Sequence, residues 1–419
     1  MKIAFVTLGC RTNQAESGQL SRMAIEKGHE VVSLTENADV CIINTCSVTA
    51  KADYQSRQAI SRALKANCEV IVTGCYAELN SSAIKASRKG VKIIGNSSKD
   101  CIVNGLPINL LQSACDNAAQ LRQRPSVKIQ DGCNNSCSYC IIPSARGRSR
   151  SVGPQTVVRQ VIDLENDGYE EIVLCGIHLG SYGQDLTIKH SLAKLLEEIL
   201  VSTHKVRIRL SSLEINEITD HFIDVFHDER ICRHLHIPLQ SGEDEILALM
   251  NRPYTTKYFK EVLGKLCSAF DNLAIGTDVI VGFPAESSSH FSNIRAFIDD
   301  NPFTYLHVFP YSDRPGTVAS TLKQKVDIRE KKDRCNEIIA LGRRKKDRFI
   351  RSNIGLEHDL LLETKTDEGW VGTTSNYIKA LIDADQDIGA RSLVRIRLTG
   401  AGSRLARGLR VISPQPSGK

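Results

Sequence analysis

The stretch GCNNSCSYCIIPSARGRSR, Gly132–Arg150, places three cysteines within eight residues: Cys133, Cys137 and Cys140. Thiolates three and four residues apart in a tight loop can converge on one inorganic centre. A structural zinc site uses four closed ligands, in two Cys-x2-Cys pairs or with histidines, but the next cysteine is Cys175. An iron–sulfur cluster is also commonly held by four thiolates, so three would leave one iron open to a small ligand. Three cysteines without metal are the alternative, but isolated thiols rarely cluster in this way.

Composition indicates a globular chain of several domains. The chain has 419 residues, with 41% hydrophobic and 24% charged residues and a net charge of +6, so we expect two to four domains. Its apolar runs are shorter than the roughly 18 to 20 residues that span a bilayer, which predicts no membrane span. The 14 cysteines occur without a secretory signal, which favours thiols kept reduced in the cytoplasm over a disulfide framework.

The first part of the chain, residues 1–115, alternates short β-branched runs with amphipathic stretches. Such alternation predicts an α/β domain, with a parallel sheet covered by helices on both faces. The expected strands are Ile3–Leu8, Val31–Leu34, Val40–Asn44, Val70–Thr73 and Val91–Ile94.

A second set of three cysteines follows three of these strands. Cys10, Cys46 and Cys75 each stand at the carboxyl end of a strand, and Gly9 and Gly74 precede two of them. Ligands of open α/β sheets gather outside the carboxyl ends of strands, so the three thiols can meet at one site, and the glycines permit close approach of the backbone. The alternative is that they pack as small apolar residues. We prefer that interpretation for the other cysteines: Cys41, Cys68, Cys101, Cys115, Cys175, Cys232, Cys267 and Cys335.

A linker is expected at about 105–125, and a second domain at 126–350. Repeated strand and helix patterns in this domain predict a full or partial βα-barrel. His234 and His236 share one face of an expected strand, a spacing seen in metal sites, although core or substrate-contacting roles are the preferred interpretation. The expected strands are Glu171–Cys175, Val206–Leu210, His234–Ile237, Ala274–Val281 and Tyr305–Phe309.

The loops after these strands are polar and rich in glycine. Because barrel active sites lie at the carboxyl face, these loops are candidates for binding a nucleoside with a zwitterionic tail. Glycine allows close approach, and hydroxyl and carboxylate groups suit a ribose and an ammonium. The candidate contacts are Gly176, Ser212, Glu214 and Gln240.

The last part of the chain, 354–415, alternates β-branched runs with turns. The runs Leu360–Glu363, Trp370–Thr374, Lys379–Ile382 and Leu393–Leu398 predict a small antiparallel barrel or sandwich. Basic charge on such a compact module predicts binding to phosphates, and a merely solubilising tail is the alternative. The arginines concerned are Arg391, Arg395, Arg397, Arg404, Arg407 and Arg410.

Taken together, these motifs resemble the radical S-adenosylmethionine (SAM) methylthiotransferase family across essentially the whole chain. The motifs that carry the resemblance are TLGC followed by Asn13, NTC at Asn44–Cys46, GC at Gly74–Cys75, CNNSCSYCIIPSARGRSRS, HIPLQSG, DVIVGFP and FPYSDRPGT. The resemblance implies that Cys133, Cys137 and Cys140 hold a [4Fe–4S] cluster whose open iron chelates SAM beside Tyr139. It further implies a second [4Fe–4S] cluster on the strand-end cysteines, and identifies the last module as a TRAM-like RNA-binding barrel.

The same resemblance implies the chemistry. A 5′-deoxyadenosyl radical made from SAM removes hydrogen from a carbon, and a methylthio group is attached there, with a second SAM as methyl donor. The stretches Cys10–Ser17, Asn44–Thr49 and Gly176–Gly183 are most similar to enzymes that act at C2 of threonylcarbamoyl-modified adenosine next to the tRNA anticodon. Isopentenyl-adenosine or a ribosomal-protein aspartate is the alternative substrate. A non-catalytic iron–sulfur protein that binds RNA or carries electrons is the alternative from another class.

Two further expectations concern partners and SAM contacts. We expect tRNA and a reducing electron donor as partners of a monomeric enzyme. The superfamily's common Gly-Gly-Glu stretch is here replaced by Cys175-Gly176-Ile177-His178. The contact that this stretch makes to the SAM amine therefore does not carry over to a single residue.

Overall fold

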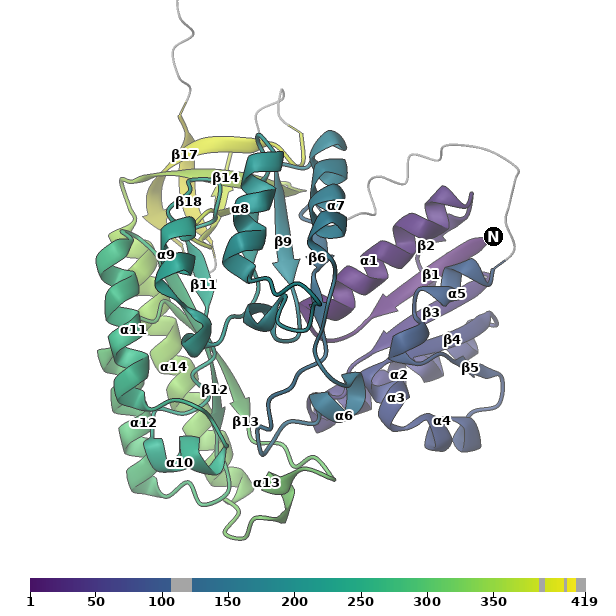
Figure 1. The fold of residues 1–419 in the computed structure, drawn as a ribbon, viewed down its shortest axis with the longest axis horizontal. Helices are drawn as coiled ribbons and strands as arrows, with labels where there is room; N and C mark the ends of the chain where they lie inside the picture. The colour runs from purple at the N-terminus through teal and green to yellow at the C-terminus, as the bar shows by residue number, and fades with distance from the viewer. Residues whose placement is uncertain (107–122, 384–388, 403–404, 412–419) are drawn as a thin grey trace, which may run out of the picture. The chain divides into compact units, whose positions relative to one another are not determined.

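The computed structural model describes residues 1–106, 123–383, 389–402 and 405–411 (Figure 1). The chain forms two compact units, neither of which is one continuous stretch. Unit 1 comprises Met1–Gly153, Cys175–Lys189 and Ser312–Leu322, and unit 2 comprises Pro154–Leu174, His190–Tyr311 and Lys323–Lys419. Most of the expected linker at 105–125 lies outside the described residues, and the domain limits 1–115, 126–350 and 354–415 stay predictions.

Unit 1 contains a five-stranded sheet of order β2-β1-β3-β4-β5, in which every neighbouring pair is parallel. Its strands are β1 (Lys2–Thr7), β2 (Glu30–Val32), β3 (Val40–Thr45), β4 (Glu69–Gly74) and β5 (Val91–Ile93). These are the strands expected from the sequence, to within two residues at each end. The prediction of a parallel α/β sheet is therefore confirmed.

Both faces of this sheet are buried, because side chains alternate between two apolar clusters along each strand. Ile42 and Ile71 belong to the cluster that includes Leu20 of α1, whereas Ile43 and Val72 belong to the cluster on the other face. A near-continuous apolar run such as VCIIN is the sequence pattern this burial requires. The helices around the sheet are α1 (Arg11–Glu26), α2 (Ala50–Lys65), α3 (Cys75–Leu79), α4 (Ser81–Ser87) and α5 (Cys101–Asn104).

The strand order places a topological switch point between β1 and β3, because the chain runs from β1 outward to β2 and then returns to the other side of β1. Open α/β sheets bind ligands at the carboxyl ends of strands at such a point. Cys10 follows β1 and Cys46 follows β3, so both lie at this point, and Cys75 follows the next strand, β4.

The remaining elements of unit 1 are short. A two-stranded antiparallel pair, β7 and β8, brackets the loop that carries Cys133, Cys137 and Cys140. The elements are η1 (Asn96–Ser98), β6 (Ser126–Lys128), β7 (Gln130–Asp131), α6 (Ile142–Arg146), β8 (Arg150–Ser151), η3 (Leu179–Ser181) and α13 (Val318–Thr321).

Unit 2 contains an arc of parallel strands, which is the predicted partial barrel. β9 (Glu171–Cys175) pairs with β10 (Arg207–Leu210), and β12 (Ala274–Val281) pairs with both β11 (His234–His236) and β13 (Tyr305–Pro310). Isolated parallel bridges, Ile208 with Ile231 and Ser212 with His236, connect β10 to the β11 region.

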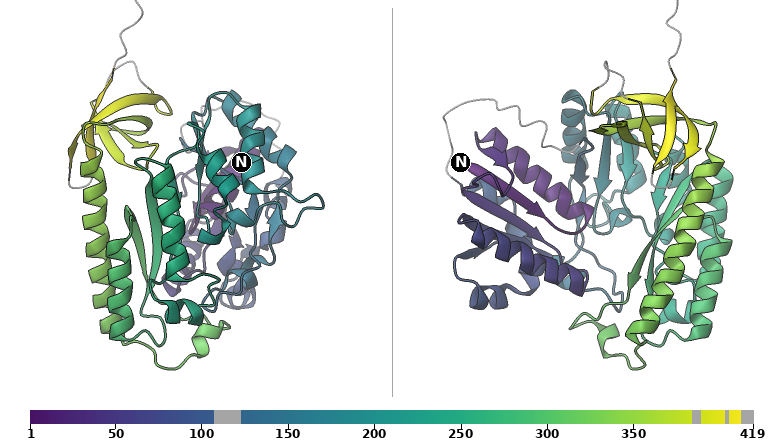
Figure 2. Two further views of the ribbon diagram at one scale, coloured as in Figure 1. Left: turned by 60° about the vertical axis from the view of Figure 1, so that its left-hand side comes forward. Right: turned by 180° about the vertical axis from the view of Figure 1, so that it is seen from behind.

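The helices of unit 2 follow the βα alternation expected from the sequence. Helix α14 lies against β13 and leads into the C-terminal barrel (Figure 2). The helices are α7 (Pro154–Asn166), α8 (Leu192–Ser202), η4 (Ile215–Glu217), α9 (Asp220–Phe226), α10 (Asp244–Leu249), α11 (Thr256–Ala269), α12 (Ser288–Asp300) and α14 (Ile328–Ser352).

The C-terminal module is a closed barrel of order β14-β15-β16-β18-β17. Its strands are β14 (Glu357–Thr366), β15 (Gly369–Thr374), β16 (Lys379–Ile382), β17 (Leu393–Ala401) and β18 (Ala406–Arg410). The sequence predicted the first four, but not β18, because its residues Ala-Arg-Gly-Leu-Arg include none that is β-branched. One pair, β16 with β18, is parallel and the others are antiparallel. The predicted fold class is confirmed, with this one parallel pair as a correction.

None of the helices in the described part of the chain has the length and apolar character that crossing a bilayer requires.

Gly74 provides a test of the close approach at the carboxyl end of β4. Its φ is +95°, and an added Cβ would lie 2.3 Å from the Thr45 carbonyl oxygen. Gly90 has a similar φ of +86°, but an added Cβ there meets nothing within 4 Å. We expect Gly90→Ala to destabilise unit 1 by about 1 kcal/mol and Gly74→Ala by about 3 kcal/mol or more. Thermal unfolding of both variants and the parent measures the difference in stability. Equal midpoints for the two variants would show that the backbone at Gly74 has room beside Thr45.

Candidate active site

The three strand-end cysteines lie at neighbouring turns in unit 1. Cys46 and Cys75 are buried, whereas Cys10 is exposed at the start of α1. An added Cβ on Gly9 would lie 2.8 Å from Cys46 Sγ, so glycine lets the turn after β1 pass directly beside the second thiol. The turns of Cys10 and Cys46 therefore lie side by side, and binding of one centre by all three strand-end cysteines stays a prediction.

Asn13 and Thr45 fix these turns to one another. The side-chain amide of Asn13 donates to the carbonyl oxygens of Leu8 (2.6 Å), just after β1, and Thr45 (3.0 Å), at the end of β3. The Thr45 hydroxyl donates to the Thr73 carbonyl at 2.5 Å and so connects the ends of β3 and β4. Because carbonyl groups inside a protein need hydrogen-bond donors, these contacts fix the positions of the turns after β1, β3 and β4.

Arg146 is the residue that connects this site to the cysteine loop. It ends α6, six residues after Cys140, and its side chain is fully buried. Its Nε donates to Cys75 Sγ at 3.3 Å. The guanidinium also donates to Glu16 (2.9 Å), Asp131 (2.7 Å) and Asn13 Oδ1 (2.5 Å). One side chain thus binds three elements that lie far apart in the sequence.

Two lysines complete the buried charge cluster around Glu16. Lys99 pairs with Glu16, and Lys128 Nζ lies 3.1 Å from Glu16 and 3.4 Å from Asp131. Burial alone would raise the pKa of Glu16, but Arg146, Lys99 and Lys128 outweigh it and hold that pKa well below its ordinary value. Three basic side chains therefore face two carboxylates beside Cys75.

These features suit an anionic centre bound by the strand-end thiols. Burial raises the pKa of the Cys46 thiol to about 11 and raises the pKa of Cys75 as well, although Arg146 opposes this. Only thiolates bind metal, so binding must release protons from these groups. The Arg146 guanidinium, which donates to Cys75 Sγ, favours the thiolate form of that residue.

The segment Ser312–Leu322 belongs to unit 1 and holds the turn after Cys46. Arg314 donates to the Ser47 hydroxyl (2.9 Å) and pairs with Asp53 (2.7 Å), and the Ser312 hydroxyl accepts from the Ala50 amide (3.1 Å). Ser312 and Arg314 of the sequence motif YSDRPGT therefore support the turn that follows Cys46.

The Cys133, Cys137 and Cys140 loop closes tightly on itself. The Cys133 amide donates to the Gly147 carbonyl (3.0 Å), and the Cys140 amide donates to the Cys137 carbonyl (3.1 Å). Gly132 has a φ of +72°, and an added Cβ would lie 2.0 Å from the Arg148 carbonyl oxygen. All three cysteines are partly exposed, as ligands of a centre that must also admit a substrate would be.

His178 lies beside this loop. In the sequence it stands out only because it belongs to the stretch that departs from the superfamily pattern. Its Nδ1 is 3.8 Å from Cys133 Sγ, and its backbone amide donates to Gln130 Oε1 at 2.8 Å. An added Cβ on Gly176 would lie 2.8 Å from the same Gln130 oxygen. Gly176 is therefore required for close packing of this turn on β7.

The predicted SAM contacts are divided between the two units, with Tyr139 and Gly176 in unit 1 and the others in unit 2. In unit 2, Ser212 is bridged to His236, and the Glu214 carboxylate pairs with Arg252. The Gln240 backbone has a φ of +65° and its amide donates to the Asp278 carbonyl (2.9 Å). Contact of these residues with SAM stays a prediction.

Two arginines of the barrel have acidic partners that the sequence pattern did not reveal. Arg395 pairs with Glu357 and Asp359 across β14 and β17, and Arg397 pairs with Glu357. The Arg391 guanidinium lies 4.5 Å from the ring centroid of Tyr169. Arg407 and Arg410 lie on β18, and Arg404 falls outside the described residues. Exposed ion pairs contribute little to stability, so they do not exclude phosphate binding. Phosphate binding by these arginines stays a prediction.

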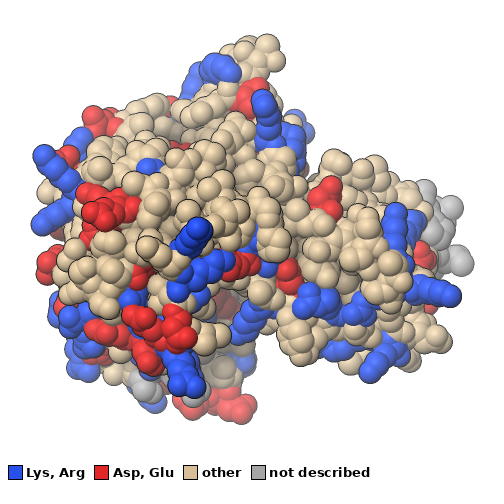
Figure 3. Space-filling model, turned by 90° about the horizontal axis from the view of Figure 1, so that it is seen from below, with Lys and Arg blue, Asp and Glu red and all other residues tan. Residues whose placement is uncertain are grey.

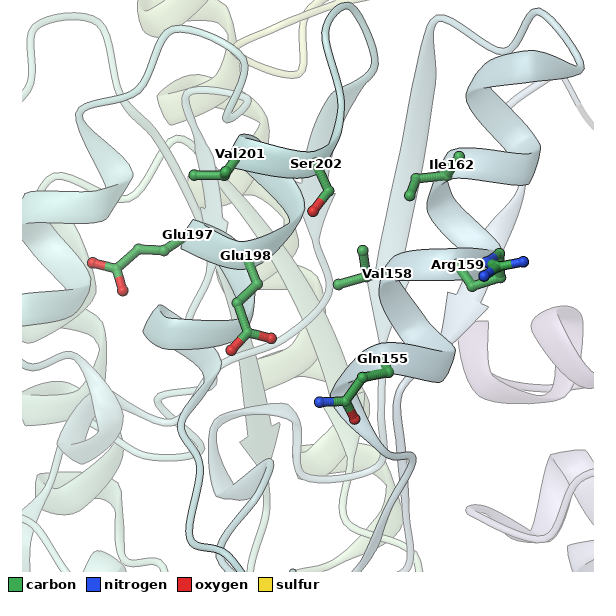
Figure 4. Close-up of a pocket in the computed structure, with 8 residues that line it drawn as sticks. All are labelled: Gln155, Val158, Arg159, Ile162, Glu197, Glu198, Val201 and Ser202. Carbon is green, nitrogen blue, oxygen red and sulfur yellow. The ribbon is translucent and has the colours of Figure 1, made fainter.

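Two surface features of the molecule add no chemistry to the site. On the face drawn in Figure 3, basic side chains are interspersed with acidic ones, so the charge of +6 is not gathered there. A groove of about 500 Å³ lies between α7 and α8 (Figure 4). Its lining has no thiol, histidine or glycine; it consists of Gln155, Val158, Arg159, Ile162, Glu197, Glu198, Val201 and Ser202.

Comparison with solved structures defines the class of fold. The chain is similar to the radical SAM methyltransferase TsrM from Kitasatospora setae, with a TM-score of 0.54 and 15% identity, covering 76% of this chain and 77% of that one. It is also similar to the cobalamin-dependent radical SAM enzyme OxsB, with a TM-score of 0.52 and 11% identity, covering 81% of this chain and 56% of that one. Residues 127–298 match the radical SAM superfamily. The fold is that of a radical SAM enzyme.

Sequence relatives define the family. Residues 2–95 match the Uncharacterized protein family UPF0004. The threonylcarbamoyladenosine tRNA methylthiotransferase MtaB of Bacillus subtilis is 38% identical over 96% of this chain and 94% of its own length, and that of Aquifex aeolicus is 38% identical over 94% and 100%. A tRNA-2-methylthio-N(6)-dimethylallyladenosine synthase of Thermoanaerobacter is 32% identical over 80% and 76%. The chain belongs to the family of radical SAM methylthiotransferases that includes the threonylcarbamoyladenosine tRNA enzymes.

The contribution of Arg146 to the buried charge cluster can be tested by measuring protein stability alone. Arg146→Met leaves Glu16 and Asp131 buried without their main cation, so we expect a loss of about 3 to 5 kcal/mol of stability in protein without iron. Arg150→Met is the matched control, because Arg150 is half exposed and lies 3.8 Å from Asp131, so its loss should cost less than about 0.5 kcal/mol. Chemical and thermal unfolding measure both. Similar stabilities would mean that water reaches the charge cluster.

Proposed function

We propose that this chain is a tRNA methylthiotransferase that adds a methylthio group to C2 of threonylcarbamoyl-modified adenosine next to the anticodon. The observation that carries the proposal is the identity of 38% with two threonylcarbamoyladenosine tRNA methylthiotransferases over nearly the full length of each chain. The closed C-terminal barrel supports an RNA substrate, because it presents exposed arginines on β17 and β18.

We propose two [4Fe–4S] clusters, one on Cys133, Cys137 and Cys140 and one on Cys10, Cys46 and Cys75. The first supplies reductive cleavage of SAM when it is bound, and the second supplies the site from which sulfur is transferred. The buried cations beside Cys75 and the close approach of Gly9 to Cys46 support the second site. The protein contributes the thiols, a guanidinium that favours the thiolate form of Cys75 and the loops that fix their positions.

Contacts to the small molecule and to RNA complete the proposal. SAM would be held by Tyr139, Gly176, Ser212, Glu214 and Gln240, and tRNA phosphates by Arg391, Arg395, Arg397, Arg404, Arg407 and Arg410. The enzyme would act as a monomer in the cytoplasm and take electrons from a separate reducing protein.

Nucleoside analysis of tRNA tests the substrate. In a strain lacking this gene, we expect the 2-methylthio form of threonylcarbamoyladenosine to disappear while the unmethylthiolated nucleoside accumulates. Complementation with a Cys133→Ala variant should fail, whereas the parent should restore the product.

Other outcomes of that experiment identify the alternatives. Loss of the methylthio form of isopentenyl-adenosine, or of a methylthio group on a ribosomal-protein aspartate by mass spectrometry, would move the assignment to that substrate. Unchanged nucleosides and proteins, with no 5′-deoxyadenosine made by the reduced enzyme, would favour a non-catalytic iron–sulfur protein.

Iron content tests the two clusters. After anaerobic reconstitution we expect about eight iron per chain, from two four-iron clusters. Replacing Cys10, Cys46 and Cys75 together by Ala should leave about four iron and preserve SAM cleavage, whereas the matched triple substitution at Cys133, Cys137 and Cys140 should leave about four iron and abolish cleavage. A parent protein with about four iron, unaffected by the first triple substitution, would refute the second cluster.

A further inference from the structure

The sheet β11-β12-β13 of unit 2 carries a row of polar side chains on one face. On β12, Thr277, Val279 and Val281 are buried, whereas Asp278 and Ile280 between them are partly exposed. Because side chains alternate across a strand, Asp278 lies on the face opposite the buried residues. Polar groups from β11 and β13 meet Asp278 on that face.

A chain of hydrogen bonds runs across the three strands. One oxygen of Asp278 lies 2.9 Å from His236 Nε2 on β11 and 3.2 Å from His307 Nδ1 on β13. His236 Nδ1 is 3.1 Å from the Tyr305 hydroxyl, which is also 2.8 Å from His234 Nε2. Gly276 makes room for this tyrosine, because an added Cβ would lie 2.0 Å from its ring.

Asp278 fixes which atoms the two histidines present. Burial alone would raise the pKa of Asp278, but hydrogen bonds from His236 and His307 outweigh it and hold that pKa well below its ordinary value. The carboxylate is therefore ionised and accepts a hydrogen bond from one ring N–H of each histidine. His307, whose side chain is 53% exposed, is left to present Nε2 to a ligand.

We infer that His307, oriented by Asp278, is a specificity-determining residue that hydrogen-bonds the polar N6 side chain of the acceptor adenosine. The inference rests on the proposed function. Because the Nδ1–H of His307 is used by Asp278, the neutral ring presents Nε2 as an acceptor, and a threonylcarbamoyl group offers a hydroxyl and urea N–H groups that can donate to it. An isopentenyl group offers none, and would leave the ordered Asp278 and His307 groups desolvated without compensation.

The same face also carries an aromatic surface for a base. Phe309 lies two residues after His307 on β13, so the two side chains share a face, and Phe309 is 40% exposed. Bases stack on exposed aromatic side chains without regard to sequence. A stacking surface next to a fixed hydrogen-bonding group is what recognition of a splayed, modified nucleotide requires.

The test compares two anticodon stem-loop RNAs, one with N6-threonylcarbamoyladenosine and one with N6-isopentenyladenosine, on reconstituted enzyme. We expect His307→Ala to raise KM for the threonylcarbamoyl RNA by roughly 10- to 100-fold with a smaller change in kcat, as for a hydrogen bond whose partner is left unsatisfied. His307→Gln should retain part of the affinity, and Asp278→Asn should act in the same direction. SAM cleavage without RNA should be unchanged in all three variants.

A matched control and four further outcomes make the test decisive. His221→Ala removes an exposed histidine that pairs with Glu197 at 2.9 Å on the helices of the same unit, and it should leave KM unchanged. An unchanged KM in His307→Ala, or an equal loss for both RNAs, overturns the inference. Zinc bound by the parent but not by Asp278→Asn overturns it in favour of a metal site, since the three ligand atoms lie within 4.8 Å of one another. If the parent does not modify the threonylcarbamoyl RNA at all, the proposed function itself fails.

Discussion

The buried guanidinium of Arg146 is the interaction on which the architecture of unit 1 depends. It comes from the short helix after the Cys133, Cys137 and Cys140 loop, and it contacts Glu16 of α1 and Cys75 at the end of β4. A buried charge is costly unless it is paired and hydrogen-bonded, so the loop, α1 and the β4 turn must adopt the positions that satisfy it. Two sites that could have been built independently are thereby made parts of one structure.

Much of this architecture is readable from local sequence patterns. Short apolar runs bounded by turns predict the strands of both sheets, because strands buried on both faces need continuous β-branched residues. The glycines before Cys10 and Cys75 are also informative, since both adopt a φ of +95° and stand where a side chain would collide with a neighbouring turn. The cysteine spacings indicate metal binding because reduced thiols have few other reasons to cluster.

What the sequence could not reveal are pairings between residues that are far apart. Arg146 reads as one of several arginines in RGRSR, and only folding shows that it is buried while Arg148 and Arg150 are exposed. Glu16 and Lys99 are 83 residues apart and form an ion pair. For the same reason Arg395 and Arg397 read as an uninterrupted basic surface, because their partners Glu357 and Asp359 lie on a strand more than thirty residues earlier.

The division of the chain into units has a chemical reason. Unit 1 takes in Cys175–Lys189 and Ser312–Leu322 in addition to the N-terminal half, and these segments supply His178 beside Cys133 and Arg314 beside the Cys46 turn. Loops that follow β9 and β13 of the partial barrel are thus packed with the thiols, while the strands themselves belong to unit 2. Such an arrangement lets the strands carry His307, the residue proposed to contact the substrate, on a rigid sheet. The six cysteines proposed as cluster ligands all belong to unit 1, so the charge around them can be set independently of substrate recognition.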